Sequence, residues 1–198
     1  MKFRDSVFAT LLFGIIFIAV YLIHNRFFTV NVVFYAAIGD AVIAVIISAV
    51  ILFFVKVFVS LTVFEKGLLT VVWILLGYSF AISVPAVIDR SLSFYILEKL
   101  QQRGGGIKQD SFQYVFVNEY MKEHRLVDVR LTEQLESGTI KIEHGCVLLT
   151  PKGSRMAMLS RWYRLNILPK KRLLMGEYSD DLTDPFRNSA PPPDYTCR

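Results

Sequence analysis

The sequence predicts a mainly α-helical membrane protein, in which about three N-terminal transmembrane helices are followed by a small α+β domain. Hydrophobic residues make up 54% of the 198 residues, which is more than an ordinary soluble domain contains. Residues 1–88 hold five Lys or Arg and three Asp or Glu, whereas the rest of the chain holds seventeen and fourteen. We therefore place a domain boundary near Ile88.

Three stretches before this boundary are predicted to cross the membrane: residues 7–23, 41–59 and 67–88. The first is an uncharged run of 17 residues, at the lower limit for crossing about 30 Å of hydrocarbon. It is like a signal peptide, but no small-residue cleavage site follows it, so we expect an uncleaved anchor. The second includes Lys56, whose ammonium group must then extend to the head groups. The third contains 22 residues without a charge.

The segment between the first two spans has two notable features. Residues 27–39 are apolar but too short to span, and their aromatic side chains suit a segment in the membrane interface. Asp40 stands at the start of the second span, where a carboxylate can cap the free N–H groups of a helix. An acid inside the hydrocarbon would instead indicate a function. We favour the capping role.

Beyond the last span, the hydrophobic pattern predicts three helices, a hairpin and a fourth helix. Apolar residues recur every fourth position in residues 92–100, 112–120 and 127–135. Alternating residues on either side of His144-Gly145 predict two strands. Thr150-Pro151 then begins the last helix, with proline at a first-turn position. A short strand is expected between the first two helices.

This order resembles the winged-helix family over residues 91–164. The resemblance is carried by Arg130-Leu-x-x-x-Leu-x-Ser-Gly-x-Ile140 and by Leu149-Thr-Pro-Lys-Gly153. It implies that the third helix is the recognition surface, for DNA in bacterial transcription factors and for protein partners in other winged helices. No family is recognised for the membrane half.

The charges on the third helix argue against nucleic acid. A DNA-reading helix presents Arg, Lys, Asn or Gln to the bases. Here the helix presents three acids and one base, which would repel a polyanion. We therefore predict that it binds another membrane or membrane-associated protein. The predicted partner-binding residues are Asp128, Arg130, Glu133 and Gln134.

The last helix and its continuation, residues 155–175, mix basic with aromatic and aliphatic residues. This composition predicts a segment that lies on an anionic membrane surface, so membrane lipids are also expected partners. A solvated basic helix end is the alternative. The predicted membrane-surface residues are Arg161, Trp162, Arg164, Lys170, Lys171 and Arg172.

Catalysis finds little support in the sequence. Arg90, where the third span meets the interface, is a weak candidate for a lipid phosphate, because capping and snorkelling explain such residues more often. His124, His144 and Cys146 lack the paired spacing of a zinc site, so we predict no metal and no cofactor. Residues 177–198 are acidic and then proline-rich, which predicts a disordered or extended tail.

The cysteines and charges bear on the compartment. Cys146 and Cys197 are far apart in sequence, so no disulfide is expected, which fits a reducing compartment. We accordingly expect a bacterial inner-membrane protein with a cytoplasmic C-terminal domain. That orientation leaves Lys2 and Arg4 outside, against the positive-inside tendency.

Three functional hypotheses follow. The first is a non-catalytic membrane accessory or scaffold subunit that binds protein through the winged-helix-like domain, with envelope or glycolipid biosynthesis suggested by the architecture. The second is a membrane-tethered transcription regulator. The third is an enzyme that acts on a lipid-linked phosphate. The oligomeric state is left open.

Overall fold

The structure is a computed structural model that describes residues 2–187, 189 and 197. Its contacts divide the chain into two compact units, residues 1–127 (unit 1) and 128–198 (unit 2). The division therefore falls within helix α8 (Leu126–Glu136), whereas the change in composition lies near Ile88.

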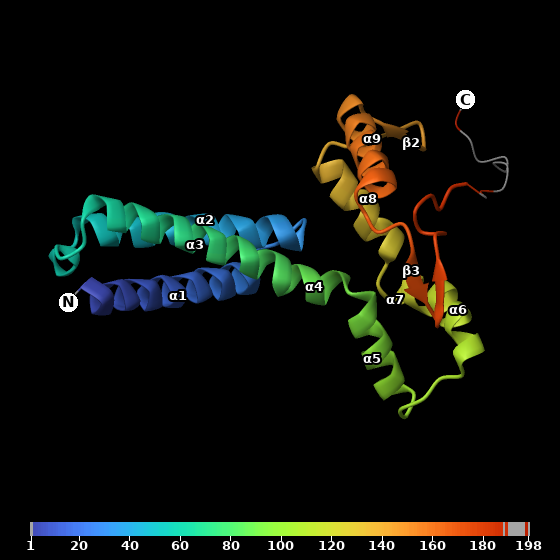
Figure 1. The fold of residues 1–198 in the computed structure, drawn as a ribbon, viewed down its shortest axis with the longest axis horizontal. Coiled ribbons are helices and arrows are strands. Elements are labelled where there is room, and N and C mark those ends of the chain that lie inside the picture. The colour runs from blue at the N-terminus through green and yellow to red at the C-terminus, as the bar shows by residue number, and fades with distance from the viewer. Residues whose placement is uncertain (1, 188, 190–196, 198) are drawn as a thin grey trace. The chain divides into compact units, whose positions relative to one another are not determined.

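Unit 1 begins with three long helices that lie side by side (Figure 1). Each is long and apolar enough to cross a membrane, the third when it is counted together with α4. The predicted number of such helices is thus confirmed, although their bounds differ from the predicted spans. The bounds are α1 (Lys2–Phe27), α2 (Val33–Phe54), α3 (Val63–Ser83) and α4 (Pro85–Arg90).

The second helix starts earlier than predicted. Residues 33–39 belong to α2 and do not form a separate segment. Val32 is the N-cap residue, and its side chain makes no capping hydrogen bond. Asp40 therefore lies inside the helix, is 1% exposed, and does not cap it. The capping interpretation was wrong because an apolar stretch without proline continues the helix backwards through Gly39.

The connection from α2 to α3 is a short 3₁₀ turn, η1 (Lys56–Phe58). Val55 is extended and ends α2, so Lys56 lies in this turn and not within a span. Helix α3 begins with a capping box, in which Thr62 Oγ1 accepts from the Glu65 N–H and Glu65 Oε2 accepts from the Thr62 N–H.

Small and aromatic residues hold the three helices together. Helices α2 and α3 approach closely at Ala41 and Gly77, because a Cβ added to Gly77 would lie 2.6 Å from the Ala41 Cβ. Small residues at such contacts let helix backbones pack tightly in a membrane. The buried Trp73 ring stacks on Phe13 at 5.3 Å and its Nε1–H donates to Thr10 Oγ1 at 3.2 Å.

The rest of unit 1 is a small helical assembly. Helix α5 (Leu92–Gln102) is capped by Ser91, whose side chain accepts from the Phe94 N–H. No strand forms in residues 103–108, so the expected first strand is absent. A second helical segment then follows, built from η2 (Gln109–Ser111), α6 (Phe112–Tyr114), the π-helical η3 (Val115–Tyr120) and α7 (Met121–Glu123).

Unit 2 contains α8, two hairpins and α9. Strands β1 (Ile140–Glu143) and β2 (Cys146–Leu149) pair antiparallel, joined by a two-residue turn in which both residues have positive φ. Helix α9 (Pro151–Asn166) starts at Thr150, whose side chain accepts from the Gly153 N–H. These elements agree with the predicted helix, hairpin and helix.

The end of unit 2 differs from the prediction. Helix α9 ends at Asn166, because Pro169 lacks the N–H that a continued helix needs. The chain then forms a second antiparallel hairpin of β3 (Arg172–Leu174) and β4 (Glu177–Ser179). The start of the predicted tail is thus a strand. The proline-rich stretch 191–193 lies outside the described residues.

Candidate functional site

The predicted partner-binding residues of α8 are partly engaged within the unit. Arg130 Nη1 donates to Glu133 Oε2 at 2.8 Å, one helical turn away. The Gln134 carbonyl accepts from both the N–H and the hydroxyl of Thr139 at 3.0 Å, and its amide oxygen also contacts that hydroxyl. Asp128 is exposed. On helix α8, Asp128 and Glu136 are therefore exposed, whereas Glu133 is paired with Arg130 and is 14% exposed.

The more prominent feature of unit 2 is apolar. Among its described residues no hydrophobic side chain is buried. Scattered exposed hydrophobic residues are normal on a soluble domain, whereas larger apolar surfaces are typical of interaction sites. We call this exposed set the apolar surface of unit 2. It comprises Ile142, Val147 and Leu149 on the first hairpin, and Met156, Leu159, Trp162 and Tyr163 along α9 with Ile167 directly after it.

The six predicted membrane-surface residues do not share one helix. Arg161, Trp162 and Arg164 lie in α9, whereas Lys170 and Lys171 follow it and Arg172 begins β3. The predicted membrane-surface segment, residues 155–175, is thus partly helix and partly strand.

The segment after β4 folds back on these basic residues. Asp184 lies 3.9 Å from the Arg161 guanidinium, and the Phe186 ring lies 5.7 Å from that of Arg164. Thr183 donates to the Lys170 carbonyl at 2.7 Å. Part of the basic charge is thus met by the chain's own acidic segment, which weakens the case for an anionic lipid surface there.

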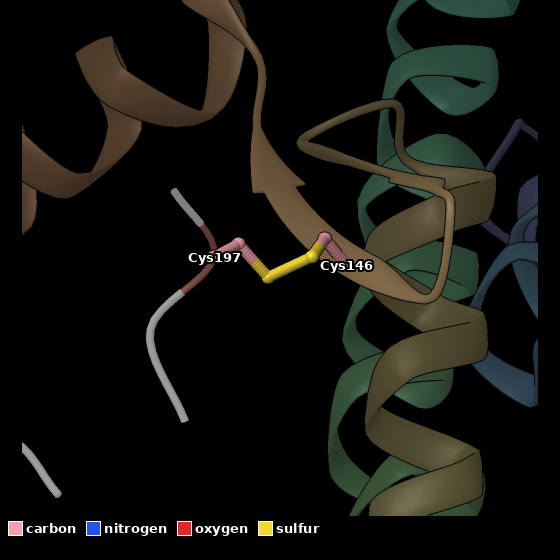
Figure 2. The surroundings of a disulfide bond; sticks show 2 residues. All are labelled: Cys146 and Cys197. Carbon is pink, nitrogen blue, oxygen red and sulfur yellow. A yellow bond between two sulfur atoms is a disulfide. The ribbon is translucent and has the colours of Figure 1, made fainter. Parts of the chain in front are cut away.

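Cys146 and Cys197 form a disulfide, which corrects the expectation that both are reduced (Figure 2). Their separation of 51 residues in sequence gave no indication of it. The bond ties strand β2 to the C-terminal end of the chain. Disulfides persist in oxidising compartments and are rare in the cytosol. The paired cysteines therefore give no support to the expected reducing compartment.

Arg90, the candidate for a lipid phosphate, packs on the protein. Its guanidinium lies 5.9 Å from the centre of the Phe34 ring, a distance at which the cation is attracted to the ring face.

A polar cluster between α5 and the continuous helical segment of η3 and α7 was not predicted. Lys99 is 4% exposed, and its ammonium lies 2.7 Å from Glu119 and 2.6 Å from Glu123. Tyr95 donates to Glu123 at 2.9 Å, and Arg103 donates to Glu119 at 3.0 Å. We call these five residues the Lys99 cluster. The four-residue spacing within each helix was the available signal, but only the fold shows that the two helices face each other.

The electrostatics of the Lys99 cluster favour a structural role. Hydrogen bonds that the ammonium donates to Glu119 and Glu123 raise the pKa of Lys99, and the same hydrogen bonds lower the pKa of both carboxyl groups. A lysine held as a cation cannot act as a nucleophile or base at neutral pH. A cavity of about 290 Å³ beside it is lined by charged and polar side chains. We assign the cluster to holding α5 against η3 and α7.

The fold thus defines a general class of protein: three long apolar helices joined to a small helical assembly and a unit with two hairpins. Comparison with known proteins gave no match, since no family model, curated protein or solved structure is significantly similar to this chain.

Proposed function

We propose that this chain is a non-catalytic integral membrane subunit whose C-terminal unit binds another protein. The three long apolar helices support membrane insertion. The observation that supports partner binding is the apolar surface of unit 2, which has no hydrophobic core of its own among the described residues. A covering protein would remove this surface from water and so stabilise the unit.

The winged-helix interpretation of residues 91–164 is part of this proposal. The order of α8, the first hairpin and α9 supports it, whereas the missing strand in residues 103–108 does not. Asp128 and Glu136, the exposed acids of α8, favour a protein partner over DNA.

We further propose that unit 2 faces an oxidising compartment, opposite to the orientation expected from sequence. The disulfide supports this orientation. The charges at the two ends of the helices are balanced. One end carries Lys2, Arg4, Lys56 and Lys66, and Lys2 lies 2.9 Å from Glu65 at that end. The opposite end carries Arg26 and Arg90, and Lys99, Arg103 and Lys108 follow shortly after Arg90. The disulfide is therefore the observation that carries this orientation.

Partner binding is tested by mild detergent extraction of the full chain at native expression. We expect a stoichiometric partner that is lost when Leu159→Asp and Trp162→Asp are combined. Ser160→Asp adds a charge to the same helix between these positions and should retain the partner. A monodisperse 22.7 kDa species without a partner, or equal partner retention by all variants, would contradict the proposal.

The orientation is tested separately with reporters fused to the C-terminal end of the chain. An alkaline phosphatase fusion should be active, because this enzyme needs disulfides, and a green fluorescent protein fusion should be dark. The reverse pattern would place unit 2 in the cytoplasm and return the tethered DNA-binding hypothesis to consideration.

A further inference from the structure

A buried carboxylate in the helical bundle has one oxygen without a partner. Asp40 Oδ1 lies 2.6 Å from His24 Nδ1, while Oδ2 is buried and has no hydrogen-bond partner. The Asp40 side chain is 2% exposed. A buried acceptor left without a donor costs free energy, and more so when it is charged. A bound ligand with a donor would remove that cost.

The imidazole satisfies only one of the two oxygens. When the carboxyl group is ionised, Nδ1–H of His24 donates to Oδ1, and this holds for the neutral and for the charged imidazole. In both cases Oδ2 accepts no hydrogen bond from the imidazole. With a neutral imidazole, the pair also carries one negative charge in an apolar setting.

Asp40 lines a cavity of about 330 Å³ whose other walls are almost entirely apolar. The cavity lies between the last turns of α1 and the first turns of α2, so it is near one end of both helices. At 1.5 Å per residue, Asp40 is about 10 Å along α2 from its first residue, which is within reach of lipid head groups. The apolar walls are formed by Val20, Ile23, Phe28 and Ile43.

We infer that this cavity binds a membrane lipid with a primary ammonium head group, whose N–H donates to Asp40 Oδ2. The carboxylate complements the positive charge, and charge-assisted hydrogen bonds of this kind are among the stronger ones. The apolar walls suit the acyl chain of the same molecule. A head group with a quaternary ammonium has the same charge but no N–H, so it cannot satisfy Oδ2.

Native mass spectrometry of the full chain in a non-ionic detergent tests this inference. The protein is mixed with equal amounts of dioleoyl phosphatidylethanolamine and dioleoyl phosphatidylcholine, whose acyl chains are the same and whose head groups differ in the three N-methyl groups that replace the N–H donors. We expect the ethanolamine lipid to be retained about tenfold over the choline lipid, as for one hydrogen bond to a charged group. Equal retention of the two lipids would overturn the inference without any variant.

Two variants and a control locate the binding. Asp40→Asn should bring the two lipids to equal retention. Ile43→Trp should do the same by filling the cavity, and it leaves the carboxylate in place in case Asp40→Asn does not fold. Asp5→Asn is the matched control, because this second buried carboxylate already has partners in Arg4 and Ser60. An ethanolamine preference that persists in Ile43→Trp and in folded Asp40→Asn would overturn the assignment to this cavity.

Discussion

The Sγ atom of Cys146 in strand β2 is bonded to the Sγ atom of Cys197, 51 residues further along the chain. Closing a loop of this length restricts the unfolded chain, so the bond should stabilise unit 2 by about 2–4 kcal/mol. We expect one disulfide-linked peptide pair on non-reducing peptide mapping, and a lower midpoint of denaturation after reduction. The Cys146→Ser, Cys197→Ser double variant should be insensitive to reductant. Two thiols that react in the unreduced native protein would contradict the pairing.

Gly153 allows α9 to pack against the first hairpin. A Cβ at this position would lie 2.0 Å from the Thr139 carbonyl oxygen and 2.9 Å from Leu149 Cδ1. Gly153→Ala should therefore destabilise unit 2 by about 1–3 kcal/mol, as overpacking does, despite the gain of about 1 kcal/mol in helix propensity. Chemical denaturation of the full chain in detergent measures the change. Arg155→Ala, on the exposed side of the same turn, should leave the stability nearly unchanged. If Gly153→Ala and Arg155→Ala change the stability equally, the close approach of Gly153 to Thr139 does not limit the packing of α9.

The Lys99 cluster predicts a defined response to acid. The pKa values of Glu119 and Glu123 lie below their ordinary value of 4.5 in the folded chain. Their contribution to stability is therefore complete above pH 4.5 and is lost as the pH falls through the lowered values. On the basic side, the pKa of Lys99 is raised above 10.5, so its contribution is complete below that pH.

Near-ultraviolet circular dichroism should report this acid transition, because Tyr95 and Tyr120 pack in contact beside the ion pairs. Glu119→Gln should weaken the pH dependence below 4.5. Glu98→Gln removes a carboxylate from the same helix as Lys99 and should leave the dependence unchanged. A signal that is flat from pH 7 to pH 3 would show that the ion pairs do not hold the two helices together.

The periodicity of hydrophobic residues correctly predicted those elements whose boundaries are set by residues next to them in sequence. The helix that starts at Thr150-Pro151 and the hairpin around His144-Gly145 carry their own cap and turn residues, so the structure reproduces both. The predicted second span begins too late because it treats Asp40 as a helix boundary, whereas Asp40 lies inside α2 and its partner His24 comes from another helix. A charge at the edge of an apolar run marks a helix end only when water solvates it.

The candidate sites were harder to predict because they depend on contacts between distant residues. The prediction that the basic stretch after Arg161 lies on a membrane surface rests on composition alone. Composition does not reveal that Asp184 and Phe186 contact this stretch. The Lys99 cluster needs two helices in register, and the disulfide needs a C-terminal residue beside β2. Sequence spacing of 20 residues or more contains little information about such pairs.

The close approach of Ala41 and Gly77 gives a prediction about the bundle. A Cβ at Gly77 would lie 2.6 Å from the Ala41 Cβ and 3.6 Å from its Cα. Gly77→Ala should therefore push α2 from α3 and lower the resistance of the full chain to denaturation by about 1–3 kcal/mol. Because the clash involves a single methyl group, Ala41→Gly in the same chain should restore most of the loss. Gly67→Ala, in the same helix with nothing within 4 Å of the added Cβ, serves as the control. If the double variant is no more stable than Gly77→Ala alone, the helices do not meet at these two residues.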